Sequence, residues 1–351
     1  MFVGCRSESK PAPIVTAALP APELREAALD PHLAVDPQNP QRIVVAAAYG
    51  APPDSTHGIW TWTTSNGGKE WIGTTMPIPR ASAKHATGAR VAFDGTGRAL
   101  LTFAFADSAS RGGAAIASSG RRDLQLGPAR RLIPDRIDEA GASVATPSLG
   151  YDGSALSPLR GSVYLAWRYA STDSSALWVA STRNVSAPWR EKSRVLDGLA
   201  GAIATRSDGA LEVIVLDRSG RRLVRTSSTD GGLSFAHPDP VATRPDSVRI
   251  HHLVATVAPG DTSLVCWNET AAARPSRRAS WCARGSEGGW SAPVAIADPD
   301  RPGDVVETIA VASGAGGLWL LTWRADSTSM EVELQRSTDG GRTFQRFAVV
   351  G

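Results

Sequence analysis

Short apolar runs separated by glycine and aspartate recur along the whole chain. In each copy, one apolar run is followed by a Gly/Asp turn and by a second run that often ends in an aromatic residue. The copies fall at residues 33–36 with 43–48, 91–95 with 100–103, 148–153 with 163–167, 203–209 with 211–216, 253–260 with 264–267, and 309–314 with 318–323. Short apolar runs bounded by turn residues are typical of β-strands. The pattern therefore predicts six similar β units.

A second motif repeats in phase with these strands. Residues 64–71 read TSNGGKEW, residues 228–235 read STDGGLSF and residues 337–344 read STDGGRTF, and degenerate relatives begin at residues 118, 181 and 282. The six copies are about 55 residues apart, which is within the length of a propeller blade of four short strands. The motif resembles the Asp-box, or bacterial neuraminidase repeat, of sialidase-like β-propellers. We therefore predict an all-β fold, a six-bladed β-propeller with four antiparallel strands per blade, over residues 31–351.

The residues of this motif are expected to stabilise its turn. Asn66, Asp230 and Asp339 can accept hydrogen bonds from backbone N–H groups of the same turn, and the paired glycines permit positive φ. The recurring tryptophans are expected to pack between the sheets. The resemblance implies that these turns lie on one face of the propeller and that a substrate would bind on the other face.

Residues 1–30 are expected to form a leader outside the blades. Small residues precede Cys5, and a polar, proline-containing stretch follows it at residues 6–13. This arrangement resembles the lipobox and tether of a bacterial lipoprotein, and it implies a lipid anchor on Cys5 and an extracytoplasmic protein, in the cell envelope or secreted. A frayed terminus of a cytosolic protein is the alternative.

The remaining two cysteines lie on consecutive strand-like runs. A hairpin with its loop at residues 268–278, folded about Arg274, would place Cys266 opposite Cys282. A cross-strand disulfide fits an exported protein, and two buried thiols fit a cytosolic one. No histidine or second cysteine lies at ligand spacing beside either residue, so we expect no metal site here.

The charge balance argues against nucleic acid as a partner. The chain carries 37 basic and 34 acidic residues, a net charge of +3, spread without the basic block that binds phosphates. We expect a monomer without a cofactor, whose partner is a carbohydrate or another polar ligand, with a protein partner as an alternative.

The catalytic residues that the sialidase resemblance implies are incomplete. A sialidase holds the sugar carboxylate with three arginines and attacks with a tyrosine from the last blade. Neither Ile-Pro step in the chain, in PIPR at residues 77–80 or LIPD at 132–135, follows an arginine as the family motif requires. The four tyrosines, Tyr49, Tyr151, Tyr164 and Tyr169, all lie in the first half. We therefore expect the protein to lack the standard sialidase set.

The connections on the expected substrate face still carry polar side chains that could bind a ligand. The candidate ligand-binding residues are His85, Arg90, Glu139, Arg168, Tyr169, Arg249, His252, Glu269, Glu307 and Arg324. The leading hypothesis is an exported propeller that binds a glycan or another polar ligand at its central face. The alternatives are a divergent sialidase or other glycoside hydrolase with carboxylates from that face, and a protein-interaction scaffold.

Overall fold

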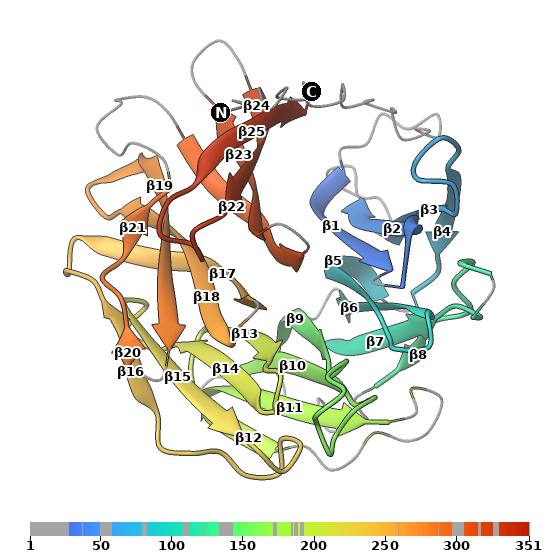
Figure 1. Ribbon diagram of the computed structural model, residues 1–351, viewed down its shortest axis with the longest axis horizontal. Helices are drawn as coiled ribbons and strands as arrows, with labels where there is room; N and C mark the ends of the chain where they lie inside the picture. The colour runs from blue at the N-terminus through green and yellow to red at the C-terminus, as the bar shows by residue number, and fades with distance from the viewer. Residues whose placement is uncertain are drawn as a thin grey trace, which may run out of the picture.

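Six antiparallel sheets are arranged around a central axis (Figure 1). The computed structural model describes residues 28–36, 38–49, 58–78, 83–107, 112–121, 123–132, 143–170, 174–183, 185, 189, 193–258, 260–286, 288–296, 305–314, 317–325 and 330–350. Each sheet is built from strands that are consecutive in the chain, so the predicted six-bladed β-propeller with sequential blades is confirmed.

The first three blades use the N-terminal half of the chain. Blade 1 is β1 (Ala28–Asp36), β2 (Asn39–Tyr49), β3 (Gly58–Thr64) and β4 (Ile72–Met76). Blade 2 is β5 (Ala83–Phe93), β6 (Ala99–Asp107), β7 (Gly112–Ser118) and β8 (Arg130–Arg131). Blade 3 is β9 (Ser143–Tyr151), β10 (Val163–Ala170), β11 (Ser175–Thr182) and β12 (Ser193–Asp197). Because β1 begins at Ala28, the first blade starts slightly before residue 31, and residues 1–27 lie outside the described residues.

The last three blades repeat this order. Blade 4 is β13 (Ala200–Thr205), β14 (Leu211–Leu216), β15 (Arg222–Ser228) and β16 (Asp239–Thr243). Blade 5 is β17 (Val248–Ala258), β18 (Thr262–Ala271) and β19 (Arg274–Ser286), and its outer strand is split into β20 (Gly289–Trp290) and β21 (Val294–Ala295). Blade 6 is β22 (Val305–Gly314), β23 (Gly317–Ala325), β24 (Met330–Ser337) and β25 (Gln345–Val350).

The first strand of every blade lies nearest the axis. These inner strands are β1, β5, β9, β13, β17 and β22, and each contacts the next around the ring, with β22 returning to β1. The core lies between neighbouring blades, where alternate side chains of facing sheets interdigitate. Phe103 and Phe105 pack between blades 1 and 2, and Trp267 packs between blades 4 and 5.

The three Gly-Gly turns each join the third strand of a blade to the fourth. In blade 6, Asp339 Oδ1 accepts hydrogen bonds from the backbone N–H groups of Arg342 and Thr343 at 2.9 and 3.0 Å, and Gly340 and Gly341 have φ of 72° and 84°. Hydrogen bonding, led by that from the Thr343 hydroxyl, holds the pKa of Asp339 well below its usual 3.8. Consecutive strands are antiparallel, so all three turns lie on one face, which we call the turn face. We call the opposite face, with the second-to-third and fourth-to-first connections, the loop face.

Cys266 and Cys282 are directly paired across β18 and β19 and form a disulfide, with their Cα atoms 4.1 Å apart. The hairpin that brings them together is tighter than the sequence indicated. β18 continues to Ala271 and β19 begins at Arg274. A turn at residues 272–273 therefore replaces the expected loop over residues 268–278. The β18–β19 ladder extends through this polar stretch, for example where Glu269 pairs with Ala279. Polar residues of this kind have a low β-propensity, which is why the sequence indicated a loop.

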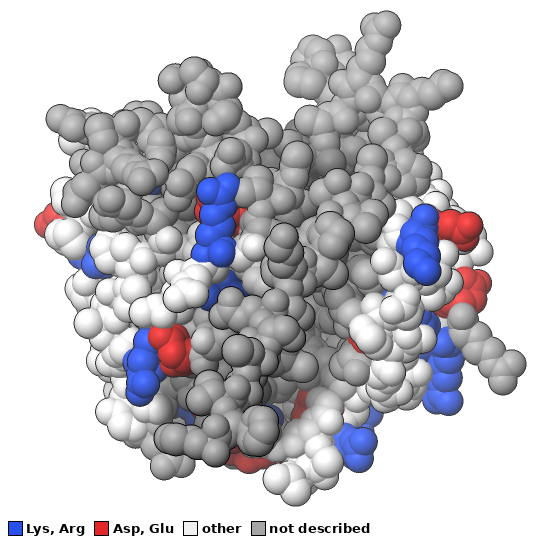
Figure 2. Space-filling model, turned by 45° about the horizontal axis from the view of Figure 1, so that its top comes forward, with Lys and Arg blue, Asp and Glu red and all other residues white. Residues whose placement is uncertain are grey.

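Acidic and basic side chains are mixed on the surface. Figure 2 shows lysine and arginine side chains beside aspartate and glutamate at several places on one face. Among the described residues there is no helix with the length and apolar character needed to cross a membrane.

Candidate functional site

Five of the six inner strands change register against their neighbours. The shifts lie between Leu29 and His32 in β1, between Thr87 and Arg90 in β5, between Ala145 and Ser148 in β9, between His251 and Leu253 in β17, and between Thr308 and Ala310 in β22. Such bulges redirect side chains and are frequent beside functional sites. In this propeller they place a histidine or an arginine at the bulges of three inner strands.

These three residues, His32 of β1, Arg90 of β5 and His252 of β17, form what we call the central cluster. His32 contacts β5 directly, because its ring accepts the N–H of Val91, the neighbour of Arg90, and the charges of Arg90 and His252 both lower the pKa of His32. The Arg90 side chain is buried and its Nη1 donates to the Ala89 carbonyl at 2.8 Å, so the guanidinium is fixed in position. Three groups that carry or can carry positive charge are therefore gathered from three blades.

His32 is held as a neutral imidazole. Its Nδ1 accepts a hydrogen bond from the Val91 N–H at 3.2 Å, which leaves the proton on Nε2. Burial, followed by the charges of Arg90 and His252, lowers the pKa of His32 from 6.5 to about 3. At neutral pH this residue therefore offers a hydrogen-bond donor beside Arg90 without adding a second fixed charge.

His252 occupies a backbone conformation that residues other than glycine seldom adopt. Its φ is 49°, and the corresponding bulge in β5 contains Gly88 with a φ of 63°. A bulky residue in the left-handed region costs free energy and persists where the surrounding structure enforces it, often at functional sites. The strain at His252 supports a role for its side chain in the central cluster.

A second group of charged side chains lies between blades 5 and 6. Glu307 of β22 is approached by His251 Nε2 at 3.3 Å and by Arg278 Nη1 at 2.5 Å, and we call these three residues the Glu307 cluster. The side chains of His251 and Arg278 are 38% and 41% exposed, so this cluster is open to solvent. His251 and His252 thus serve different clusters, as expected for neighbours in a strand.

Glu269 lies in a different environment from the other candidates. It is only 5% exposed, between blades 4 and 5, and Trp267 Nε1 donates to its Oε1 at 2.7 Å. Arg244 engages the same carboxylate, with Nη2 donating to Oε2 at 3.0 Å. Both carboxylate oxygens are therefore occupied by protein groups, which is the arrangement of a structural ion pair.

The other predicted ligand-binding residues lie in different surroundings, and for some of them the side chain is not described. Arg168, at the loop-face end of β10, donates through Nε to Ser175 Oγ at 2.9 Å, and Tyr169 packs against the apolar cluster around Trp167. Arg249 is exposed and donates to backbone carbonyls at the start of β17. His85 and Arg324 belong to β5 and β23 but their side chains lie outside the described residues, as does the whole of Glu139. The structure therefore places Arg90 and His252 each within electrostatic range of His32, whereas Glu307 contacts His251 and Arg278.

Three residues in these clusters, His32, His251 and Arg278, were absent from the candidate set. His251 is the chain neighbour of the candidate His252, and its side chain approaches Glu307 instead. His32 lies on β1 within an apolar run, and its signal is a lone polar residue at an inner-strand position. Arg278 was assigned to a loop, and its place opposite Thr270 in β19 carries it toward Glu307. In the part of the chain that the structure describes, no group of three or more His, Cys, Asp or Glu side chains is arranged to hold a metal ion.

We expect the protein to lose stability as the pH falls below about 6.5, because of His32. Its pKa is lower in the folded protein than in the unfolded chain, so acid protonates the unfolded state first and favours it. The free energy of unfolding should fall by roughly 1–2 kcal/mol between pH 7.5 and pH 5, allowing for the partial exposure of the ring. Urea unfolding at a series of pH values measures this change.

The matched variant is His32→Gln, which keeps a hydrogen-bonding side chain and cannot titrate. Its unfolding free energy should be nearly constant over the same pH range. An equal loss of stability in the variant and in the wild-type protein would show that another group causes the acid sensitivity.

Comparison with known proteins identifies the fold and leaves the family open. No family model and no curated protein sequence matches the chain. Among solved structures, an ulvan lyase, a polysaccharide lyase, superimposes with a TM-score of 0.61 at 12% identity over 92% of this chain and 85% of its own. A leech intramolecular trans-sialidase in complex with 2,7-anhydro-Neu5Ac superimposes with a TM-score of 0.61 at 11% identity over 92% of this chain and 68% of its own.

The intramolecular trans-sialidase from Ruminococcus gnavus is a third similar structure, with a TM-score of 0.59 at 11% identity over 85% of this chain and 90% of its own. The ulvan lyase has also been solved with a GlcA(1-4)Rha3S unit bound, and this complex superimposes with a TM-score of 0.59. These likenesses show that the chain has the propeller fold of sialidases and of this lyase.

Proposed function

We propose that the protein binds an acidic saccharide at its central face, above the central cluster. The observation that carries this proposal is the convergence of His32, Arg90 and His252 from three inner strands. An arginine can hold a carboxylate through two parallel hydrogen bonds, and the neutral His32 adds a donor beside it. The Neu5Ac derivative and the glucuronate unit bound to the similar propellers both carry a carboxylate, which supports this class of ligand.

We infer further that the protein acts outside the cytoplasm. The disulfide between Cys266 and Cys282 is typical of an oxidising compartment, and the sequence around Cys5 resembles that of a lipoprotein. Labelling of the expressed protein with a radioactive fatty acid tests the anchor, and substitution of Cys5 by serine should abolish the label.

Standard sialidase chemistry is not part of the proposal. The chain has no tyrosine after Tyr169 from which the last blade could present a nucleophile. Tyr164 is fully buried, and burial raises the pKa of its phenol. Tyr49 packs edge-on against Trp60 with ring centroids 5.4 Å apart. Tyr49 and Tyr164 are thus poorly suited to nucleophilic attack.

A second candidate function is β-elimination at a uronic acid, favoured by the pairing of Arg90 with neutral His32. In this reaction a base removes the proton next to the carboxylate, the glycosidic bond breaks, and the departing oxygen takes a proton. A cation near the carboxylate stabilises the negative charge that develops. His252 would serve as the base, because the only unprotonated ring nitrogen of His32 already accepts from the Val91 N–H. A glycoside hydrolase would instead need two carboxyl groups at the substrate. The carboxylate of Glu307 is already paired with Arg278 and His251.

The test is calorimetric titration with sialyllactose and with uronic acid oligosaccharides, using lactose and maltotriose as neutral comparators. We expect the acidic ligands to bind more tightly than the neutral ones. Arg90→Gln should weaken the acidic ligands about tenfold or more, because a charge-assisted hydrogen bond contributes roughly 1.5–3 kcal/mol. His252→Asn, which tolerates a positive φ, should weaken them as well.

Arg222→Gln is the matched control, because Arg222 is exposed at the loop-face end of β15, the third strand of its blade, and not on one of the inner strands that carry the central cluster. It should leave the affinity unchanged. Equal affinity for acidic and neutral sugars, or an Arg90→Gln variant that binds as the wild type does, would contradict the proposal. Ultraviolet detection of an unsaturated uronate product distinguishes elimination from binding alone.

A further inference from the structure

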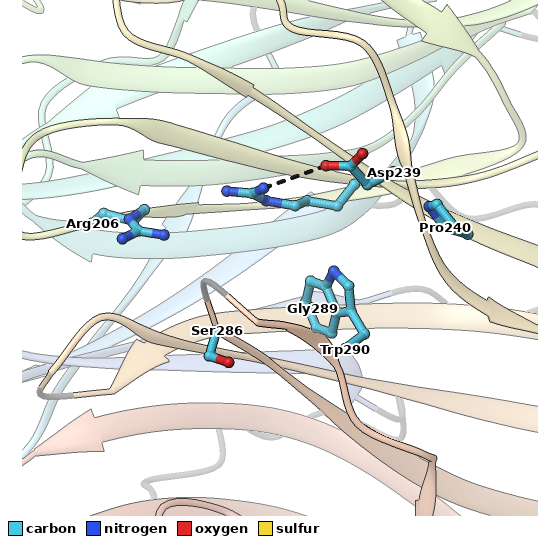
Figure 3. Close-up of a pocket in the computed structure, with 7 residues that line it drawn as sticks. Arg206, Asp239, Pro240, Ser286, Gly289 and Trp290 are labelled. Atoms are coloured by element: carbon cyan, nitrogen blue, oxygen red, sulfur yellow. Dashed lines mark ion pairs between the residues drawn. The ribbon is translucent and has the colours of Figure 1, made fainter.

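A cavity of about 570 Å³ lies between blades 4 and 5, away from the central cluster. Blade 4 contributes Arg206 from the turn between β13 and β14, Arg225 from β15 and Asp239 from β16, and blade 5 contributes Ser286 and Trp290. Figure 3 shows Arg206 and Asp239 on one side of the cavity and Ser286 and Trp290 on the other. Since Arg206 and Ser286 belong to a first-to-second and a third-to-fourth turn, the cavity opens toward the turn face.

One wall of the cavity is a fixed aromatic ring. The backbone of Gly285 lies against the indole of Trp290, and a Cβ atom at Gly285 would come within 2.8 Å of the ring. This contact holds one side of the indole and leaves the half-buried ring as part of the cavity lining. A planar apolar surface of this kind suits the C–H face of a pyranose ring.

The opposite wall is polar and nearly neutral. Arg225 Nη2 donates to the buried Glu212 at 2.6 Å, and Arg206 Nη1 lies 3.5 Å from the same carboxylate. Arg225 Nη1 lies 3.7 Å from Asp239 Oδ2, too far for a hydrogen bond, so both groups keep hydrogen-bonding capacity. Since the charges of Arg206 and Arg225 are offset by Glu212 and Asp239, this wall offers donors beside acceptors and no excess of positive charge.

We propose that the cavity between blades 4 and 5 is a second saccharide site that takes a neutral glycosyl residue. Alternating donors and acceptors match vicinal hydroxyls, and Trp290 matches the apolar face of the ring. The volume lies within the range of roughly 300–1,000 Å³ typical of small-molecule sites. The central cluster is cationic and this cavity is balanced, so the two sites select different sugars.

A second cavity, between blades 1 and 2, can be compared with the cavity between blades 4 and 5. Its volume is about 680 Å³, and its lining includes Trp60, Thr74, Gln125 and Pro128 without a charged side chain among the described residues. A similar space with an aromatic residue therefore exists elsewhere in the ring. The paired arginines and carboxylates distinguish the cavity between blades 4 and 5.

The experiment is saturation-transfer NMR and calorimetric titration of the full chain with the methyl glycosides of glucose, galactose, mannose, fucose and xylose. We expect at least one of these neutral glycosides to bind. Trp290→Ala and Arg206→Gln should each weaken that binding about tenfold or more, and Arg90→Gln should leave it unchanged. The Arg206→Gln variant keeps the test valid if Trp290→Ala fails to fold.

Trp71→Ala is the matched control, because Trp71 ends the corresponding Gly-Gly motif of blade 1 and packs beside Trp60 and Trp62. It should leave glycoside binding unchanged. The proposal is wrong if none of the five glycosides binds at millimolar concentration, if binding survives both cavity variants, or if Arg90→Gln abolishes it. Because the central site is tested with acidic ligands, failure of one proposal is distinguishable from failure of the other.

Discussion

Replacing Glu269 by alanine is expected to lower the free energy of unfolding by about 3–5 kcal/mol. The carboxylate is 5% exposed and is bonded by Trp267 Nε1 and by Arg244. Without it, the Arg244 guanidinium, which lies 4.6 Å from the centre of the Trp281 ring, would keep a charge in a largely buried place with no carboxylate beside it. The cost of an uncompensated charge exceeds that of the few atoms removed. Urea unfolding followed by circular dichroism measures the loss.

Two variants complete this test. Glu269→Gln keeps an acceptor for Trp267 and should lose less stability than Glu269→Ala. Glu70→Ala removes an exposed acid from the Gly-Gly turn of blade 1 and should change stability by less than about 1 kcal/mol. If Glu269→Ala unfolds at the wild-type urea concentration and instead loses saccharide binding, Glu269 is a ligand-binding residue.

Removing the disulfide is expected to lower the free energy of unfolding by about 3 kcal/mol. Cys266 and Cys282 are 16 residues apart, and in the chain-entropy account a bridge over a loop of this length stabilises a protein by about that amount. Unfolding the wild-type protein with and without a reductant measures the effect. In the Cys266→Ala/Cys282→Ala double variant the reductant should have no effect. A wild-type protein whose unfolding is insensitive to the reductant would contradict a structural role for the bridge.

The repeated architecture was predictable because its determinants are local. The Gly-Gly turns carry their own acceptor and their own positive φ, as at Asp339 and Gly340, so a few residues of sequence reveal each one. The apolar runs of the inner strands identify the blades in the same way. Six copies of two patterns in phase gave the number of blades.

The clusters were less predictable because they depend on which blades face each other. His32, Arg90 and His252 are separated by most of the chain, and their proximity follows from closure of the ring. Glu269 looked like a loop-face carboxylate because the sequence placed it in a loop. The β18–β19 ladder instead extends past it, and Arg244 from the preceding connection covers its carboxylate.

The sequential order of the strands has a consequence for the synthesis of the molecule. Each described sheet is built from one contiguous stretch of chain, so among the described strands no blade exchanges a strand with another, and the ring is closed by contact of β22 with β1. A nascent chain can therefore finish each sheet as its last strand leaves the ribosome, and each new blade finds the apolar face of the preceding one already formed. The pairings within a sheet have short sequence separations, which favours rapid folding for an all-β protein of this size.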